Sequence, residues 1–259
     1  MEIPAKIRTT TAPKTTESVR QKLAVVIPTL NEAGNIPTLL RRLHSALDGV
    51  RFDYELIVVD DDSRDGTADL VREYTRKDPR IRLLVRKGQR GLAGAVIYGW
   101  QHTDATLLGV IDADLQHPPE VLPELLAAIQ QGHDIAIASR YTANSHDSVS
   151  DRSKLRRLIS RASILATAPL QRRGVRVKDP MSGYFVARRE CIDGLDLQPR
   201  GFKILLEILV KGRLQNAAEI PFRFGTRHAG SSKAGLKVAV DYFSLLGKLW
   251  CYALFRPQQ

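Results

Sequence analysis

Short apolar segments rich in Val and Ile recur between residues 23 and 139, and each is followed by polar or glycine residues. These candidate strands are residues 23–29, 55–60, 80–85, 106–112 and 134–139. Helical spacing of apolar side chains separates them, at residues 34–47, 66–75, 91–102 and 118–130. Strands that are apolar throughout are buried on both faces. The alternation therefore predicts an α/β fold in which helices flank a mainly parallel central sheet.

Composition limits the partners and the compartment. The 259 residues carry a formal net charge of +11, which favours an anionic partner such as a nucleic acid, an acidic membrane surface or a phosphorylated substrate. The two cysteines and six histidines show no zinc-like spacing, so a reducing, cytosolic setting fits best. Residues 1–22 lack an apolar core and are predicted to form a flexible tail, not a signal peptide.

Three later segments bear on membrane contact. Residues 142–151 are polar without periodicity, which is typical of a lid or of a surface connection. Residues 153–170 combine basic side chains with apolar ones at helical spacing, as in a membrane-surface helix or a core-packing helix with a solvated basic face. Residues 237–259 are predicted to form an amphipathic helix and a tail; Asp241 and Lys248 make the helix too charged for a membrane span.

Two carboxylates, Asp112 and Asp114, stand one residue apart where an apolar strand ends. Magnesium is commonly held by one or two carboxylates while substrate phosphates complete its shell. Gln116 offers an amide oxygen and His117 an imidazole nearby, and Gln116 is the better candidate ligand. The alternative is a loop whose aspartates only cap the following helix.

Other polar residues follow the remaining strands, and ligands bind at the carboxyl ends of strands in open parallel sheets. The cluster Asp60-Asp61-Asp62-Ser63 is suited to accept hydrogen bonds from a base or ribose, whereas Asp65 is a candidate helix cap. The segment 28–32 contributes a proline-shaped turn and Glu32. Three cations, Arg140, Arg227 and Lys233, are suited to phosphate binding, although each alone could be a surface charge.

Together these motifs resemble the polyprenyl-phosphate hexose synthases of glycosyltransferase family 2, the group typified by dolichyl-phosphate mannose synthase. Five ordered blocks carry the resemblance: residues 28–32 (PTLNE), 58–67 (VVDDDSRDGT), 91–95 (GLAGA), 112–119 (DADLQHPP) and 139–141 (SRY). Three further blocks separate this subgroup from other members of the family: residues 178–184 (KDPMSGY), 201–207 (GFKILLE) and 219–224 (EIPFRF). The resemblance implies a GT-A-like nucleotide-sugar-binding fold, with residues 23–236 as the catalytic domain.

The resemblance also implies roles for individual residues. The donor site would be lined by Pro28, Leu30, Glu32, Val59, Asp61, Asp112, Ala113 and Asp114. Arg140, Arg227 and Lys233 would contact phosphates, and the catalytic residues would be Asp112, Asp114 and Arg140. Asp112, Asp114 and Gln116 would surround Mg2+ or Mn2+. Leu30 stands where the family often has tyrosine, and Asp62 where it often has glycine, so the donor stays open between GDP-mannose and UDP-glucose.

The implied reaction is inverting transfer of a hexose from a nucleotide-sugar donor to a polyprenyl phosphate acceptor. Many relatives carry C-terminal membrane-spanning helices, whereas this sequence ends soon after residue 255. The expected location is therefore peripheral, on the cytoplasmic face of a membrane, through a surface helix or a membrane-anchoring partner subunit.

Three other classes of protein fit less well. A haloacid-dehalogenase-type phosphatase also uses D-x-D after a strand, but near the start of the chain. A nucleic-acid-binding module is not expected, because aromatic residues make up only 6% and no stacking motif accompanies the basic residues. A nicotinamide-binding enzyme lacks its G-x-G-x-x-G signature, of which residues 91–94 are too short a match.

Overall fold

A seven-stranded sheet organises the computed structural model, which describes residues 21–50, 52–141, 167–171, 175–198, 203–223, 225 and 236–255. The strands are β1 (Lys22–Thr29), β2 (Asp53–Asp60), β3 (Ile81–Val85), β4 (Leu107–Val110), β5 (Ile135–Ser139), β6 (Phe185–Arg188) and β7 (Ala217–Pro221). The helices are α1 (Ile36–Leu47), α2 (Thr67–Lys77), α3 (Leu92–Gln101), α4 (Leu122–Gln130), α6 (Ile204–Lys211) and α7 (Leu236–Leu254). Short 3-10 turns are η1 (Pro119–Val121), η2 (Ala168–Leu170) and η3 (Arg189–Cys191).

The strand order is β3-β2-β1-β4-β6-β5-β7, and β6 alone among these strands runs antiparallel to its neighbours. From β1 the chain first builds outward through β2 and β3 and then crosses to the other side of β1 with β4. The carboxyl ends of β1 and β4 therefore flank the point where the strand order reverses. Open α/β sheets bind their ligands at such a point.

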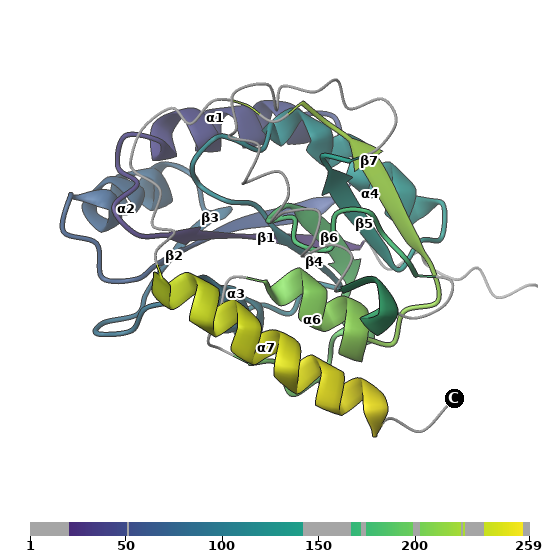
Figure 1. The fold of residues 1–259 in the computed structure, drawn as a ribbon. Coiled ribbons are helices and arrows are strands. Elements are labelled where there is room, and N and C mark those ends of the chain that lie inside the picture. The colour runs from purple at the N-terminus through teal and green to yellow at the C-terminus, as the bar shows by residue number, and fades with distance from the viewer. Residues whose placement is uncertain are drawn as a thin grey trace, which may run out of the picture.

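Helices cover both faces of the sheet (Figure 1). On one face apolar side chains of α1, α2 and α4 share a core with Leu23, Val25 and Ile27 of β1; on the other, those of α3 and α6 share a second core with Ala24 and Val26. Because successive strand residues point to opposite faces, a strand covered on both sides must be apolar at every position. This explains the uninterrupted apolar segments of the sequence.

Helix α7 lies on the outside of this arrangement, across α6 (Figure 1). Leu245, Leu246 and Leu249 of α7 are buried against Leu206 and Val210 of α6. Near the C-terminal end of α7, apolar side chains are exposed to solvent. Trp250 and Tyr252 are each 40% exposed, and Phe255, after the helix, is 86% exposed. Within the described residues, no helix combines the length and apolarity that crossing a bilayer requires.

The structure confirms the predicted fold class and its five strands, four helices and C-terminal helix, with small shifts at their ends. The elements β6, β7 and α6, all in the second half of the chain, were not predicted from the sequence. The proposed lid at residues 142–151 lies outside the described residues, as does most of the helix expected over 153–170. The described end of that segment forms the turn η2.

Candidate active site

The loops that follow β1, β2 and β4 contain backbone conformations that are unusual for residues other than glycine. Asn31, Asp62 and Leu115 adopt φ values of 56°, 59° and 61°, and in the described part of the chain they are the non-glycine residues with positive φ. Such conformations cluster at ligand sites, where the surrounding structure holds them in place. All three follow strands whose carboxyl ends meet at one edge of the sheet.

The loops after β1 and β2 are joined by hydrogen bonds. The amide of Asn31 donates to Ser63 Oγ at 2.8 Å, and the amide of Arg64 donates back to Asn31 Oδ1 at 2.9 Å. The amide of Ala33 donates to Asp65 Oδ2 at 3.0 Å. Residues 32 or 33 positions apart in sequence are therefore joined side by side at this edge of the sheet. Asp65 also accepts from the amide of Thr67, the first residue of α2, at 3.1 Å, which agrees with its predicted role as a helix cap.

Two carboxylates of the acidic cluster at the end of β2 form intramolecular contacts. Asp60 is fully buried and accepts hydrogen bonds from Thr29 Oγ1 at 3.0 Å and from the Ser63 amide at 2.9 Å. Asp61 is 4% exposed and forms a two-pronged ion pair with Arg86 (Nε to Oδ1, 2.7 Å; Nη2 to Oδ2, 3.0 Å). Its Oδ2 also accepts from the Gly91 amide at 2.8 Å. Asp61 therefore anchors the loop before α3 at this edge.

Asp112 and Asp114 lie on the loop after β4, beside the reversal of strand order. The Asp112 side chain is 28% exposed. Asp114 Oδ1 accepts from the Gln116 amide at 3.1 Å, and Gln116 Nε2 lies 3.5 Å from the carbonyl oxygen of Gly225. The D-x-D loop is thus fixed both by a local turn and by the segment after β7.

Gly183 makes room for the Asp112 carboxylate. Val110 of β4 pairs with Phe185 of β6, so Asp112, two residues later, lies opposite Gly183, two residues earlier. A Cβ added at Gly183 would lie 2.6 Å from Asp112 Cγ and would overlap its carboxylate oxygens. Only glycine allows this carboxylate to lie against the β6 turn.

His117 packs behind Asp112. Its ring lies between those of Tyr184 and Phe222, with centroid distances of 6.0 and 5.3 Å, and its Nδ1 is 3.7 Å from Asp112 Oδ2. Burial, reinforced by the positive charge of Arg140, lowers the pKa of His117 to about 4. The imidazole is therefore neutral at neutral pH, and the negative charge of Asp112 stays available to a cation.

Arg140 follows β5 and is held by a buried acid. Its Nε and Nη2 each donate to Asp179 at 2.7 Å, its amide donates to the same carboxylate at 3.1 Å, and Asp179 is fully buried. Asp179 is fixed in turn by Glu219 of β7, which accepts from the Asp179 amide at 3.1 Å. Burial opposes the charge of Arg140, but the pairing with Asp179 leaves its pKa above the ordinary value.

The remaining predicted residues are placed as follows. Pro28, Leu30 and Glu32 are partly exposed where β1 ends. The side chain of Val59 is fully buried in the core, so any contact with a ligand would have to come from its main chain, and Ala113 is 4% exposed. Arg227 and Lys233 lie outside the described residues.

Four residues at this edge were missed: Arg86, Asp179, Gly183 and Lys203. Asp179, Gly183 and Lys203 fall in the blocks 178–184 and 201–207, which had been assigned to the subgroup but given no role. Lys203 precedes α6, is partly exposed, and its Nζ donates to the Met181 carbonyl at 3.3 Å. The signal for Arg86 was its position directly after a strand.

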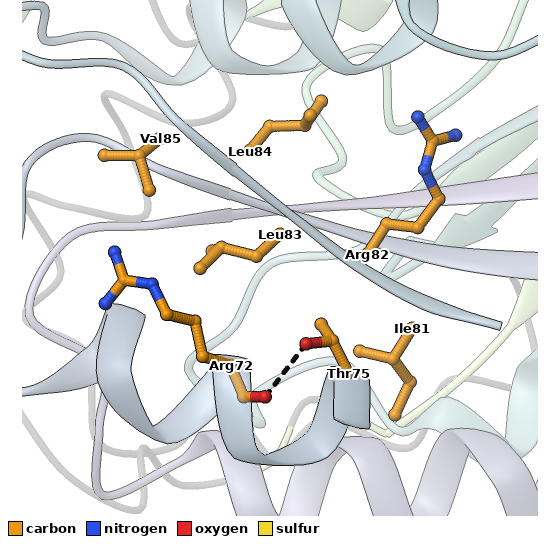
Figure 2. A pocket seen from close by; sticks show the side chains of 7 residues that line it. All are labelled: Arg72, Thr75, Ile81, Arg82, Leu83, Leu84 and Val85. Carbon is orange, nitrogen blue, oxygen red and sulfur yellow. Dashed lines mark hydrogen bonds between the residues drawn. The ribbon is translucent and has the colours of Figure 1, made fainter. Parts of the chain in front are cut away.

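The surface has two hollows, one away from the loop that carries Asp112 and Asp114 and one beside that loop. One of about 490 Å3 is lined by Arg72 and Thr75 of α2 and by residues 81–85 of β3 (Figure 2). The strand β3 is an edge strand, separated from β4 by β2 and β1, so this hollow is distant from the D-x-D loop. The second, of about 330 Å3, borders that loop at Gln116 and includes Arg42 and Arg223.

The donor set at this edge fits one hard divalent cation that shares its shell with a ligand. Among the residues that the structure describes, His, Cys, Asp and Glu side chains do not gather in groups of three or more that could hold a metal. A pair of carboxylates beside an open edge is the arrangement in which phosphate oxygens complete the shell. The neutral His117 and the space above Gly183 are compatible with that use of Asp112.

The fold is of the GT-A type. Glucosyl-3-phosphoglycerate synthase from Mycobacterium tuberculosis, solved in complex with Mn2+, uridine-diphosphate-glucose and glycerol 3-phosphate, matches with a TM-score of 0.65 at 20% sequence identity. The match covers 92% of this chain and 82% of that chain.

Sequence comparison gives the family. The Glycosyl transferase family 2 domain matches residues 24–195, and the chain belongs to this family. The dolichol-phosphate mannosyltransferase of Pyrococcus furiosus is 42% identical over 228 residues, and that of Saccharomyces cerevisiae is 34% identical over 238. Each match covers 88% of this chain. The chain spans 63% of the length of the Pyrococcus protein, less than two thirds, and 87% of the yeast protein. Family membership removes the haloacid-dehalogenase alternative.

Breaking the buried Arg140–Asp179 pair should destabilise the protein more than breaking the exposed Arg72–Asp69 pair. We expect Asp179→Asn to lower the free energy of unfolding by on the order of 2 kcal/mol, because it leaves a largely buried guanidinium without its countercharge. Asp69→Asn is the matched control, since Asp69 pairs with Arg72 but is 84% exposed; its effect should stay within about 0.5 kcal/mol. Urea denaturation of both variants measures this, and equal effects would contradict the structural role of Asp179.

Proposed function

We propose that this protein transfers a hexose from a nucleotide sugar to a polyprenyl phosphate, with GDP-mannose as the donor and UDP-glucose as the alternative. The observation that supports this most is similarity over 88% of the chain to two dolichol-phosphate mannosyltransferases. The position of Asp112 and Asp114 beside the reversal of strand order agrees with it, because a nucleoside diphosphate carried by a divalent cation would bind there.

The proposed cofactor is one divalent cation, Mg2+ or Mn2+, held by Asp112 and Asp114 with Gln116 beside them. The M. tuberculosis neighbour is described with Mn2+, which supports a divalent metal here. When bound, such a cation stabilises the negative charge that develops on a leaving diphosphate. The contribution of this chain is to present two carboxylates in a fixed loop and to keep His117 neutral behind Asp112.

The donor would lie along the edge with its base near the joined loops after β1 and β2. There Leu30 and Glu32 are partly exposed, and the buried Asp61–Arg86 pair would hold the neighbouring loop in place. The Glu32 carboxylate would accept hydrogen bonds from amide or amino groups of the base. The sugar would then extend from the Asp112 loop toward Arg140.

The reaction needs no strong base from the protein. In the proposed displacement an acceptor phosphate oxygen forms a bond to the anomeric carbon, the bond from that carbon to the diphosphate oxygen breaks, and the configuration inverts. A phosphate monoester has a second pKa of about 6, so the attacking oxygen is already ionised at neutral pH. Arg140, held in place by the buried Asp179, supplies a fixed positive charge for a phosphate oxygen.

The polyprenyl acceptor implies a membrane, and we propose a peripheral location on its cytoplasmic face. The exposed Trp250, Tyr252, Leu254 and Phe255 give the end of α7 an apolar surface suited to the headgroup region. A membrane-anchoring partner subunit is a second route to the same location.

The glycine at position 183 predicts a defect in metal binding. We expect Gly183→Ala to weaken Mn2+ affinity by on the order of tenfold or more, because the added methyl group displaces the Asp112 carboxylate. Isothermal titration of Mn2+ in the presence of GDP measures the effect. Gly247→Ala is the control, since a Cβ there meets no atom within 4 Å. Unchanged Mn2+ affinity in Gly183→Ala would remove Asp112 from the metal site.

The proposed reaction itself is tested with purified protein, Mn2+, labelled GDP-mannose or UDP-glucose, and farnesyl phosphate in detergent. We expect transfer from GDP-mannose that chelation of the metal abolishes. Asp114→Ala should lose at least 100-fold in rate, about 3 kcal/mol of transition-state stabilisation, while remaining folded. Faster transfer from UDP-glucose than from GDP-mannose would make UDP-glucose the donor. Undiminished transfer by Asp114→Ala would exclude a role of Asp114 in metal binding.

A further inference from the structure

Lys203 lies on the same edge as the D-x-D loop but is not used by the reaction described above. It immediately precedes α6, it is partly exposed, and its ammonium donates to the Met181 carbonyl at 3.3 Å. Met181 belongs to the turn between Asp179, which holds Arg140, and Gly183, which accommodates Asp112. One five-residue turn therefore positions two cations and one of the metal-binding carboxylates.

The carboxylates near Lys203 each have another cation to balance. Asp179 is neutralised by Arg140 through two hydrogen bonds. Asp112 and Asp114 together balance one divalent cation. None of these carboxylates is left as a countercharge for the ammonium of Lys203, so it can pair with an incoming phosphate.

The environment of the ammonium supports the same conclusion. Burial lowers the pKa of Lys203, the neighbouring Arg140 lowers it further, and Asp112 and Asp179 act in the opposite direction. An ammonium whose charge is disfavoured by burial and by a second cation gains more from an incoming anion than a fully exposed lysine does.

The order of groups along the edge indicates which anion this is. The loops after β1 and β2 lie on one side of the Asp112 loop, whereas Arg140 follows β5 and Lys203 faces the turn before β6, on the other side. A donor with its base at the first side and its diphosphate at Asp112 directs its anomeric carbon toward the second. In an inverting displacement the nucleophile approaches opposite the leaving group, which places the acceptor on the side of Arg140 and Lys203.

We propose that Lys203, together with Arg140, binds the phosphate of the acceptor and positions its attacking oxygen. This inference rests on the proposed function and extends it by naming a second cation of the acceptor subsite. The competing explanation is that Lys203 only stabilises the Met181 turn, and a contact with the donor diphosphate is the other alternative.

Three variants separate these explanations: Lys203→Gln, Lys203→Arg and the control Lys77→Gln, which removes the same charge from an exposed position at the end of α2. Initial rates are measured with farnesyl phosphate varied at saturating GDP-mannose. Isothermal titration measures the affinity for GDP with Mn2+, and then for farnesyl phosphate on the protein loaded with Mn2+ and GDP. Thermal melting reports on folding.

For Lys203→Gln we expect the KM and Kd for farnesyl phosphate to rise on the order of tenfold to a hundredfold, the loss typical of a hydrogen bond to a charged group. GDP affinity and melting temperature should stay close to those of the wild type. Lys203→Arg should recover part of the acceptor affinity, and Lys77→Gln should behave as the wild type.

Three results would overturn the assignment. Weakened GDP binding with unchanged acceptor binding would move Lys203 to the donor diphosphate. A lowered melting temperature with equal losses for both substrates would make it a residue of the turn only, and unchanged acceptor affinity would remove it from the site. If the wild-type protein transfers neither sugar to farnesyl phosphate, both the proposed function and the role of Lys203 are rejected. If the wild-type protein is active and Lys203→Gln is unaffected, only the role of Lys203 in acceptor binding is rejected.

Discussion

The antiparallel pairing of β4 with β6 is the interaction on which the rest of the site depends. It places Gly183 directly opposite Asp112 and so fixes one carboxylate where the strand order of the sheet reverses. The turn before β6 carries Asp179 and Met181 as well, so the same pairing positions Arg140 and Lys203. A single strand that runs against its neighbours therefore brings the anionic and cationic halves of the site together.

Buried ion pairs keep this arrangement rigid at the edge of an otherwise apolar sheet. The Asp61–Arg86 and Arg140–Asp179 pairs are both two-pronged and largely withdrawn from solvent. Such pairs contribute little net stability because of the cost of desolvation, but breaking one leaves an uncompensated charge. We infer that they hold the loops in one conformation; Asp62, next to Asp61 in sequence, has a positive φ of 59°.

The sequence was sufficient to predict the first half of the fold, and it assigned the candidate site to loops that follow those strands. Strands covered on both faces are apolar at every position, which is visible in the local sequence. Asp112 and Asp114 after β4 form a motif of three consecutive residues, which is local as well. The second half lacks such patterns. The strand β7 (Ala217–Pro221) contains alanine, glutamate and proline, and it is a strand because it pairs with β5. The strand β6 is only four residues long.

Long-range contacts explain the site residues that the sequence did not reveal. Gly183 matters because Asp112, 71 positions earlier, lies against it, and Arg86 because it pairs with Asp61. No local spacing encodes either contact. Arg227 and Lys233, which the family resemblance assigns to phosphate binding, remain predictions.

The central claim is that Asp112 and Asp114 hold a divalent cation together with the diphosphate of the donor. Anomalous diffraction from crystals grown with Mn2+ and GDP tests it most directly. The account predicts a manganese peak in coordination contact with carboxylate oxygens of both residues and with GDP phosphate oxygens. A bound GDP whose manganese contacts neither Asp112 nor Asp114 would contradict it.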